Sequence, residues 1–342
     1  MASFADLNQD AALLQQRIEH FHSVRDEILA QVRDVIVGQE DVLDQILIAI
    51  FVGGHCLLTG MPGTAKTLMV RTIADALGLV FRRIQFTPDL MPSDITGTDI
   101  IEEDLTTGHR KWTFVEGPIF GNILLADEIN RTPPKTQSAL LEAMQEHSCT
   151  VRGHVYQLPA PFFVLATQNP IELEGTYPLP EAQLDRFLFN SVLEDLSADD
   201  ELRVIDRTTA TRTTNVRAVT TAEDLLEFQR LVRMVPIAET LSRYVIALVR
   251  GTRPKSDGAP DFVKKYCNYG ASVRAAQFIV LASKARALSH KRYHVTYDDI
   301  TSVVIPILRH RVLLNFHAES EHIDTDEILN RLIAYVPRPR ES

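Results

Sequence analysis

The stretch GMPGTAKT, residues 60–67, follows the short apolar run HCLLT and constrains the fold of this chain more than any other feature. A strand, a glycine-rich turn, and a lysine and a threonine that open a helix are the elements of a phosphate cradle. Successive backbone N–H groups and the positive end of the helix face the anion. Lys66 would reach the terminal phosphates, and the Thr67 hydroxyl would ligate magnesium.

Ala65 occupies the position at which such a loop usually carries its second glycine. Because this position adjoins the start of the predicted helix KTLMVRTIADALG, we predict an ordinary negative φ there, which alanine tolerates. Gly60 and Gly63 keep the backbone freedom that the rest of the loop needs. On this motif alone, a plain strand-to-helix turn is the alternative.

The segment NILLADEIN supplies a second part of the site. A buried strand that ends in Asp127 and Glu128 would place both carboxylates at the carboxyl edge of a parallel sheet, beside the loop. Asp127 would hold the magnesium shell, and Glu128 would polarise a water molecule for in-line attack. A capping acid pair before the next helix is the alternative. PFFVLATQNP ends a strand in Gln168 and Asn169, where an amide would orient the water and an Asn-Pro turn is the alternative.

Five short apolar segments alternate with helical stretches, which predicts an α/β fold with a parallel five-stranded sheet covered by helices on both faces. These segments are HCLLT, LVFRRIQF, NILLAD, PFFVLATQ and FLFNSVL. After about Leu196 only helical patterns follow, so we predict a smaller all-α domain. The expected organisation is an amphipathic helix over 1–34, an α/β core over 35–195 and a helical domain over 196–342.

The composition is that of a globular protein and excludes several classes. A formal net charge of −10 argues against a general nucleic-acid coat, which usually carries a basic surplus. The basic stretch over 250–292 is better explained by solvated helices or by a neighbour's nucleotide, so we expect no nucleic-acid partner. Three widely spaced cysteines predict neither a disulfide framework nor a zinc site. The polar N-terminus and the shortness of ILIAIFV predict no membrane insertion and a cytoplasmic location.

Taken together, these residues resemble the AAA+ ATPases, and most closely the MoxR family within them. The similar stretches lie between Val35 and Leu314, and they are VIVGQE, GMPGTAKT, LMPSDITG, FVEGPIF, LLADEINR, LATQNP, LPEAQLDRF and YGASVRAAQ. Members of this family commonly carry alanine before the lysine. The resemblance therefore favours a working nucleotide loop, and it implies that the helical domain is the lid of an AAA+ P-loop domain.

The resemblance implies ATP and Mg²⁺ as ligands and gives each matching residue a role. The implied nucleotide contacts are Val37, Gly38, Gln39, Gly60, Pro62, Gly63, Thr64, Ala65, Lys66, Thr67 and Leu68. Of these, VGQ at residues 37–39 would border the adenine. Asp127 and Glu128 would form the Walker B pair, with Thr67 and Asp127 at the metal.

Three further residues complete the implied catalytic set: Asn169 as sensor 1, Arg186 as the arginine finger and Arg274 as sensor 2. An arginine delivered to the terminal phosphate is worth about 10³ to 10⁵ in rate. We expect Arg186 to lie on the flank opposite the chain's own lid, where it completes a neighbour's site in a ring, most often a hexamer in this family. A surface arginine paired with Asp185 is the alternative. Where family members often carry proline before the sensor arginine, this chain has Val273.

Two predicted hairpins match working surfaces of the family. GTDIIEEDLTTGHRKWTFVEG corresponds to the helix-2 insert, and SCTVRGHVYQLPAPF to the presensor-1 hairpin, with a turn at Gly153. Both would face a pore or a partner. We expect Trp112 to pack at the base of the first hairpin, with a contact residue as the alternative, and we assign no metal to His109 and His154 at the two turns.

The function that the resemblance implies is ATP-driven, chaperone-like remodelling of a protein client, commonly with a von Willebrand factor A-domain partner. One alternative is a motor of the related helicase or metal-chelatase branches. Another is an ATP-binding scaffold with little turnover. The lack of a separate DNA-binding module counts against the first alternative, and the full set of Walker B, sensor and finger residues counts against the second.

Overall fold

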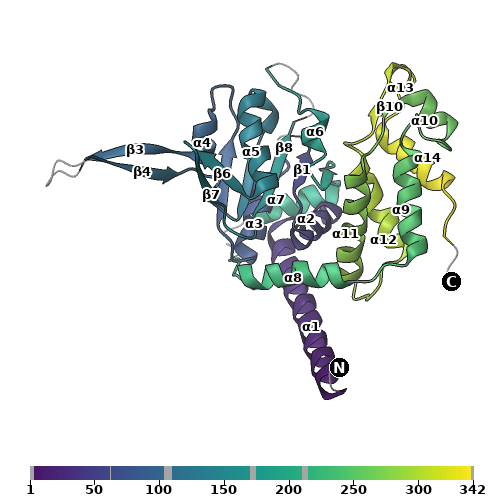
Figure 1. Cartoon of the computed structure of the whole chain (residues 1–342), viewed down its shortest axis with the longest axis horizontal. Helices are drawn as coiled ribbons and strands as arrows, with labels where there is room; N and C mark the ends of the chain where they lie inside the picture. The colour runs from purple at the N-terminus through teal and green to yellow at the C-terminus, as the bar shows by residue number, and fades with distance from the viewer. Residues whose placement is uncertain (1–3, 62, 104–109, 170–174, 210–214, 340–342) are drawn as a thin grey trace.

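The computed structural model describes residues 4–61, 63–103, 110–169, 175–209 and 215–339, with the backbone alone for 4–11. An α/β core and a helical lid lie side by side, and a long N-terminal helix extends away from the body below them (Figure 1). A two-stranded arm projects from the core on the side away from the lid (Figure 1). Within the described ranges, no helix is long and apolar enough to cross a membrane.

The core is built on a five-stranded sheet in which neighbouring strands are parallel, in the order β2-β5-β8-β1-β9. Its strands are β1 (Cys56–Thr59), β2 (Phe81–Gln85), β5 (Ile123–Asp127), β8 (Phe163–Gln168) and β9 (Phe189–Val192). All five coincide with the apolar segments of the sequence, so the predicted sheet is confirmed. Alternate residues of β5 point to opposite faces: Leu124 joins one apolar cluster and Leu125 the other.

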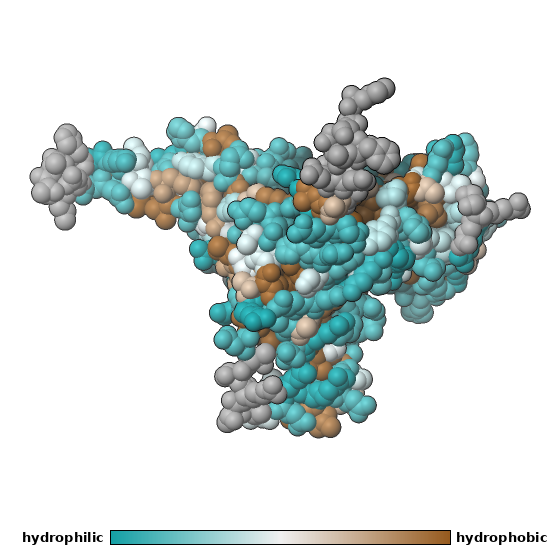
Figure 2. All heavy atoms as spheres, turned by 90° about the horizontal axis from the view of Figure 1, so that it is seen from below, coloured by the Kyte–Doolittle hydropathy of each residue, from teal (hydrophilic) through white to brown (hydrophobic). Residues whose placement is uncertain are grey.

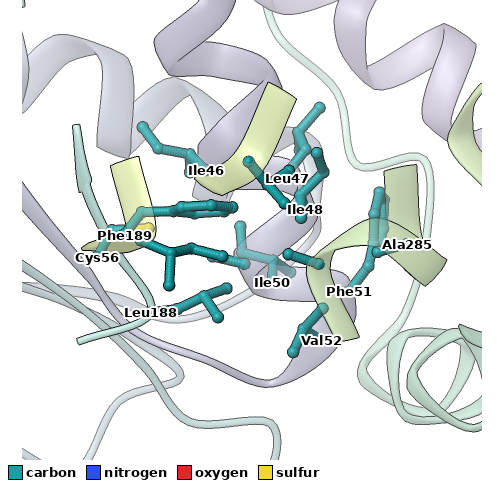
Figure 3. Packing of buried hydrophobic residues seen from close by; sticks show 14 of the residues in the cluster. Ile46, Leu47, Ile48, Ile50, Phe51, Val52, Cys56, Leu188, Phe189 and Ala285 are labelled. Atoms are coloured by element: carbon teal, nitrogen blue, oxygen red, sulfur yellow. The ribbon is translucent and has the colours of Figure 1, made fainter. Parts of the chain in front are cut away.

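Helices cover both faces of this sheet. They are α2 (Glu40–Val52), α3 (Lys66–Ala76), α4 (Pro92–Thr96), α5 (Pro134–Glu146) and α6 (Glu181–Leu184), with a 3-10 turn at Ile129–Arg131. Helix α2 is apolar nearly all round and is therefore buried. Figure 3 shows Ile50 and Phe51 of α2 between Leu188 and Phe189, at the start of β9, and Ala285 of the lid. The core and the lid thus share one apolar cluster.

The lid is helical, as predicted. Its helices are α8 (Ala222–Met234), α9 (Glu239–Gly251), α10 (Asp261–Tyr266), α11 (Val273–Ser289), α12 (Tyr297–Leu308), α13 (Phe316–Ser320) and α14 (Thr325–Tyr335), preceded by α7 (Ala198–Thr209). One detail departs from an all-α domain: β10 (Cys267–Tyr269) pairs with β11 (Leu313–Leu314) in an antiparallel ribbon. Strands this short leave no period-2 pattern in the sequence.

The N-terminal helix α1 (Phe4–Val35) buries one stripe of its surface, which includes Phe21, Ile28 and Val32. The predicted amphipathic helix is confirmed. It contacts the lid as well as the core, because Asp26 pairs with Lys291 at 3.1 Å in the turn after α11. Helix α1 therefore ties the two domains together along one side.

The two predicted hairpins both form. β3 (Gly97–Glu103) and β4 (Arg110–Glu116) make the projecting arm, and β6 (Ser148–Val151) pairs with β7 (His154–Gln157). Arg152 and Gly153, at φ 48° and 85°, make the turn of the second hairpin. The predicted Thr-Thr-Gly turn of the arm, with His109, lies outside the described residues.

Trp112 is not at the base of the arm, so that expectation was wrong. It lies opposite Ile101 in the middle of the hairpin, is 55% exposed, and has the Arg152 guanidinium 4.4 Å from its ring centre. Phe114 lies nearer the base, where it stacks on Tyr156 of the second hairpin with ring centres 4.0 Å apart. The two hairpins thus contact each other through one stacked ring pair and one cation–π contact. Figure 2 shows apolar side chains on the arm between polar ones.

Candidate active site

The loop of residues 60–67 wraps around the ammonium group of Lys66. Its Nζ donates hydrogen bonds to the carbonyl oxygens of Gly60 at 2.8 Å and Met61 at 2.7 Å. Burial lowers the pKa of Lys66, and the carboxylates of Asp127 and Glu128 act in the opposite direction. The lysine is therefore held among the loop carbonyls, close to two acidic side chains.

The N-terminus of α3 has no side-chain cap, and its first turn contains no acidic residue. The first N–H groups of a helix have no partner inside the helix and carry a partial positive charge. Lys66 and Thr67 open this helix at the end of the loop. The loop and the helix end together fit an anion of the size of a phosphate chain.

Ala65 has φ 56° and ψ 24°, so our expectation of a negative φ there was wrong. The residue precedes the first helical residue, and its carbonyl accepts the first helical hydrogen bond, from Met69 N at 2.9 Å. The chain must turn sharply at this point to pass from the loop into the helix. A left-handed conformation costs an alanine about 1 kcal/mol. The loop therefore holds its second-glycine position in a glycine-like conformation despite the methyl group.

Asp127 ends β5 with both carboxylate oxygens engaged. Oδ1 accepts a hydrogen bond from Thr167 Oγ1 at 2.7 Å, and Oδ2 accepts one from Arg83 Nη2 at 2.7 Å. The Thr167 hydroxyl also accepts from the backbone N–H of Glu128 at 2.8 Å. Side chains from the two neighbouring strands, β2 and β8, thus fix the orientation of Asp127.

Glu128 has φ 58°, a left-handed conformation that turns its side chain out of the strand. Its carboxylate accepts a hydrogen bond from Gln85 Nε2 at 2.7 Å and pairs with Arg131 Nε at 3.2 Å. The sequence analysis missed Arg83 and Gln85. Their strand β2 lies beside β5, in register with Asp127, but strand order cannot be derived from the sequence.

A cavity of about 490 Å³ brings most of the predicted phosphate and catalytic residues together. The predicted residues that line it are Gly63, Thr64, Ala65, Lys66, Thr67, Leu68, Asp127, Glu128 and Asn169. Gly60 belongs to the same loop through its bond to Lys66, and Pro62 lies outside the described residues. Hydroxyl and carboxylate oxygens, an ammonium group and a free helix end therefore share one space.

An adjoining cavity of about 310 Å³ shares Gly63, Thr64, Ala65 and Leu68 with the first and adds Val37 and Gln39. Gln39 Nε2 donates to the carbonyl oxygen of Glu194 at 2.6 Å, which links the start of α2 to the end of the sheet. Gly38 has φ 70°, and a Cβ there would lie 2.9 Å from Leu196 Cδ2. At the predicted adenine position, residues 38 and 39 therefore pack closely against residues 194–196.

The far wall of the second cavity comes from α7, which the sequence analysis missed. Val204 and Thr208 of α7 line it, together with Ile36 and with Leu196, which precedes the helix. Arg207 Nη1 anchors α7 by donating to the carbonyl oxygen of Arg33 at 2.9 Å. Helix α7 follows the predicted domain division at residue 195, and nothing in its polar sequence signals that it borders the cavity.

Arg186 and Arg274 are not among the residues that line either cavity. The Arg186 guanidinium donates to the carbonyl oxygen of Leu141 in α5. Asp185, which we considered as its partner, instead pairs with Arg311 at 2.8 Å and with Arg274 at 3.4 Å, so that alternative was wrong.

The expectation that Arg186 lies opposite the chain's own lid was also wrong. Ser272, Arg274 and Arg311 belong to the lid, and all three bind Asp185, the residue directly before Arg186. The start of α11 and the segment between α12 and β11 fold back onto the α6 segment. The lid therefore contacts the chain beside Arg186, and Arg274 pairs with the residue directly before it.

Residues 55–189 match the ATPase family associated with various cellular activities (AAA), and residues 262–332 match the AAA lid domain. Chaperone MoxR1 of Mycobacterium tuberculosis is 41% identical to this chain over 91% of the chain and 81% of that protein. The chain belongs to the MoxR family of AAA+ ATPases. The alanine-bearing loop thus lies within the part of the chain that matches the ATPase family.

Other similar proteins agree with this assignment. Protein MoxR of Paracoccus denitrificans is 28% identical over 88% of the chain and 92% of its own length. A solved structure from Cytophaga hutchinsonii, of a protein regarded as a candidate ATPase, is 42% identical and covers 97% of this chain and 99% of that one. Its TM-score of 0.89 extends the similarity to both the core and the lid.

Proposed function

We propose that this AAA+ ATPase hydrolyses MgATP in a ring, most often six-fold in this family, and uses the cycle to remodel a protein client. In the proposed reaction Glu128 takes the proton of the attacking water, Asn169 orients that water, and Lys66 binds the terminal phosphates. Arg186 and Arg274 complete the site of a neighbouring subunit. The ring is head to tail, because one flank offers the arginines and another the cavity.

The observation that carries this proposal is the separation of the two arginines from the cavity that needs them. Lys66 and two acids line the cavity, whereas Arg186 donates to Leu141 in α5 and Arg274 pairs with Asp185, and neither arginine lines it. Phosphoryl transfer gains most from a guanidinium at the terminal phosphate. A second copy that offers this flank would supply it.

Magnesium fits the residues of the larger cavity. Thr67 and Asp127 line it, and hydroxyl and carboxylate oxygens are ligands that Mg²⁺ prefers. When bound, Mg²⁺ would neutralise charge on the phosphates. Arg83 holds Asp127 in place through Oδ2, and Thr167 does so through Oδ1.

The surface that we propose for the client or partner is the arm with the second hairpin. Ile101, Trp112 and Val115 are 53%, 55% and 45% exposed, and exposed apolar side chains that gather on one element mark a candidate interaction surface. The relative from Mycobacterium tuberculosis is named a chaperone. A von Willebrand factor A-domain protein is the partner that we propose, since such partners are common in the family.

Mixing two inactive variants tests the ring mechanism. Arg186→Ala subunits keep their cavity but offer no finger, and Glu128→Gln subunits offer a finger but cannot activate water. Each variant alone should hydrolyse little ATP. In an equimolar mixture about one interface in four joins an intact finger to an intact base, so we expect about a quarter of the parent rate per subunit.

Light scattering with saturating MgATP gives the matching measurement of size. We expect a nucleotide-promoted hexamer whose activity per subunit rises with protein concentration. A monomer with flat activity over a wide dilution range, together with a mixture no more active than its parts, contradicts the ring mechanism.

A further inference from the structure

We propose that Arg311 of the lid is a positioning residue for both Arg186 and Arg274, so that the lid of each subunit sets the arginines that the subunit offers to its neighbour. This inference rests on the proposed ring mechanism and adds a residue to it. Arg311 is a buried residue whose guanidinium contacts the chain on either side of Arg186.

Arg311 holds the backbone around the finger directly. Its Nη2 donates to the carbonyl oxygens of Asp185 at 2.8 Å and Phe187 at 2.5 Å, the residues immediately before and after Arg186. Its Nε donates to the Asp185 carboxylate at 2.8 Å. A guanidinium presents its donors on three nitrogens in a rigid planar fork, whereas the three donors of a lysine share one nitrogen on a flexible stem. A lid residue thus fixes the backbone on both sides of Arg186 by hydrogen bonds.

The Arg311 side chain is only 2% exposed, and its environment is matched to a charge. Nη1 donates to the carbonyl oxygen of Ile307, and the guanidinium lies 5.1 Å from the ring centre of Phe278. Burial lowers the pKa of Arg311 to about 10, while Asp185 acts in the opposite direction, so the group stays charged at neutral pH.

His310, the neighbouring ring, adds no repulsion to this charge. Burial, and next the Arg311 charge, lower the pKa of His310 well below its ordinary value, so the imidazole is neutral. A buried ion pair seldom stabilises a fold more than apolar packing of the same shape would. The buried Arg311–Asp185 pair is therefore better explained by positioning than by stability.

Asp185 extends the same contact to Arg274. While its Oδ1 binds Arg311, its Oδ2 accepts from Ser272 Oγ at 3.1 Å and from Arg274 Nη1 at 3.4 Å. Ser272 is also the N-cap of α11, since its Oγ accepts from Arg274 N at 3.2 Å. A shift of Arg311 would consequently move the finger backbone, the Asp185 carboxylate and the start of α11 together.

Arg309 provides a matched control within the same segment. It also joins the lid to the core, because Nη1 donates to the carbonyl oxygen of Asn190 in β9 at 2.9 Å. Its other partner is Asp326 of α14, through Nε at 2.7 Å. Within the described part of the chain, Arg309 donates no hydrogen bond to residues 185–187. Replacing either arginine by lysine weakens a tie between the lid and the core, but only Arg311→Lys frees the finger.

The test places Arg311→Lys on one side of the productive interface at a time. In the donor arrangement, Glu128→Gln/Arg311→Lys subunits are mixed with Arg186→Ala subunits, and every productive interface uses a finger without its Arg311 support. In the acceptor arrangement, Arg186→Ala/Arg311→Lys subunits are mixed with Glu128→Gln subunits, whose fingers are supported. Rates are compared with the unmodified Arg186→Ala and Glu128→Gln mixture.

We expect kcat to fall at least about 10-fold in the donor arrangement and to change less than about twofold in the acceptor arrangement, with an unchanged KM for MgATP in both. Arg309→Lys should give the same rate in both arrangements. Equal losses of Arg311→Lys in the two arrangements, or no loss in the donor, would overturn the positioning role. If even the unmodified mixture stays inactive, the ring mechanism itself fails.

Asp185→Asn is the second variant, for the case in which Arg311→Lys does not fold. It keeps the size of the side chain and removes the charge that joins Arg311 to Arg274. The same asymmetry between the donor and acceptor arrangements is expected. A symmetric effect of a folded Asp185→Asn variant counts against the proposal in the same way.

Discussion

The larger cavity, here called the cradle, and the group of Asp185, Arg186, Arg274 and Arg311, here called the arginine flank, both serve the proposed ATP hydrolysis. They take their residues from different ranges of the chain. Six consecutive residues, 63–68, line the cavity, and the ends of two adjacent strands complete it. On the flank, Asp185 binds Ser272 and Arg311, which follow it by 87 and 126 positions. The loop carbonyls hold Lys66 in the first part, whereas charged side chains hold the second part together.

This difference indicates that a subunit can bind nucleotide without its lid, whereas placing the arginines requires the lid. The cradle is assembled by local turns and by parallel strands that end at one edge, so it should bind nucleotide without help from the flank. The flank exists only when the lid is folded and docked on the core. Changes in the cradle should therefore act on the subunit's own site, and changes in the lid should act through stability or through the neighbour.

Glu128→Gln is expected to have the largest effect and to act on the subunit's own site. The variant should bind MgATP like the parent but hydrolyse it at least about 100-fold more slowly, because the amide cannot take a proton from water. Steady-state hydrolysis and equilibrium binding of a fluorescent ATP analogue measure the two parts. Lys66→Ala should lose the binding instead.

Glu142→Gln is the control for this prediction, since Glu142 is exposed on α5 outside both cavities. It should hydrolyse ATP at the parent rate. If Glu128→Gln hydrolyses ATP as fast as Glu142→Gln, Glu128 is not the catalytic base.

The sequence predicted the site residues best where they follow the carboxyl ends of parallel strands. Strand β8 lies between β5 and β1, yet Asp127 and Asn169 still line one cavity with Lys66, because parallel strands end at a common edge. Neither the common edge of parallel strands nor any sequence motif predicts the order of the strands in the sheet. The contacts of Arg83 and Gln85 with the two acids depend on that order and could not be predicted.

The sequence was least informative where docking of distant elements decides the geometry. The lid could be recognised as helical, but its placement against Asp185 depends on a tertiary fit that no local pattern encodes. Helix α7 has no buried residue, and still it lines the second cavity. Its role follows from where it docks rather than from its residues.

The next prediction concerns the stability of the lid. The lid supplies contacts to the arginine flank but no residue that lines the cradle. Asp299 is fully buried in α12 and accepts from Arg292 Nη2 at 2.6 Å and Arg286 Nη1 at 3.0 Å. Asp299→Asn should destabilise the protein by about 2 kcal/mol. This is less than the 3–5 kcal/mol typical of a broken buried pair, because the arginine side chains keep 31% and 22% exposure to water. Urea unfolding measures it.

The pH dependence of this difference has a definite sign. Burial tends to raise the pKa of Asp299, but bonds from Arg292 and Thr296 outweigh it and leave the pKa lowered. A carboxyl group with a lowered pKa stabilises the fold above its unfolded pKa of about 4, and the stabilisation is lost as the pH falls through the folded value. Parent and Asp299→Asn should therefore differ at pH 7 and converge below about pH 4.

Asp298→Asn is the matched control, because Asp298 is the exposed neighbour on the same helix turn. It should cost less than about 0.5 kcal/mol. Nucleotide binding should be unchanged in both variants. A loss of nucleotide binding by folded Asp299→Asn would break the separation between cradle and lid.

The smallest expected effect tests the cradle at Ala65, the one loop position where sequence reasoning and structure disagree. At φ 56° an alanine pays a steric cost that glycine does not, whereas glycine costs up to about 1 kcal/mol more in unfolded-chain entropy. Ala65→Gly should therefore stabilise the protein by up to about 1 kcal/mol or leave it unchanged. Ala30→Gly, the same change at an exposed position inside α1, should destabilise it by about 0.5 to 1 kcal/mol. Equal destabilisation by the two variants in urea would show that Ala65 carries no strain and that the cradle tolerates alanine for another reason.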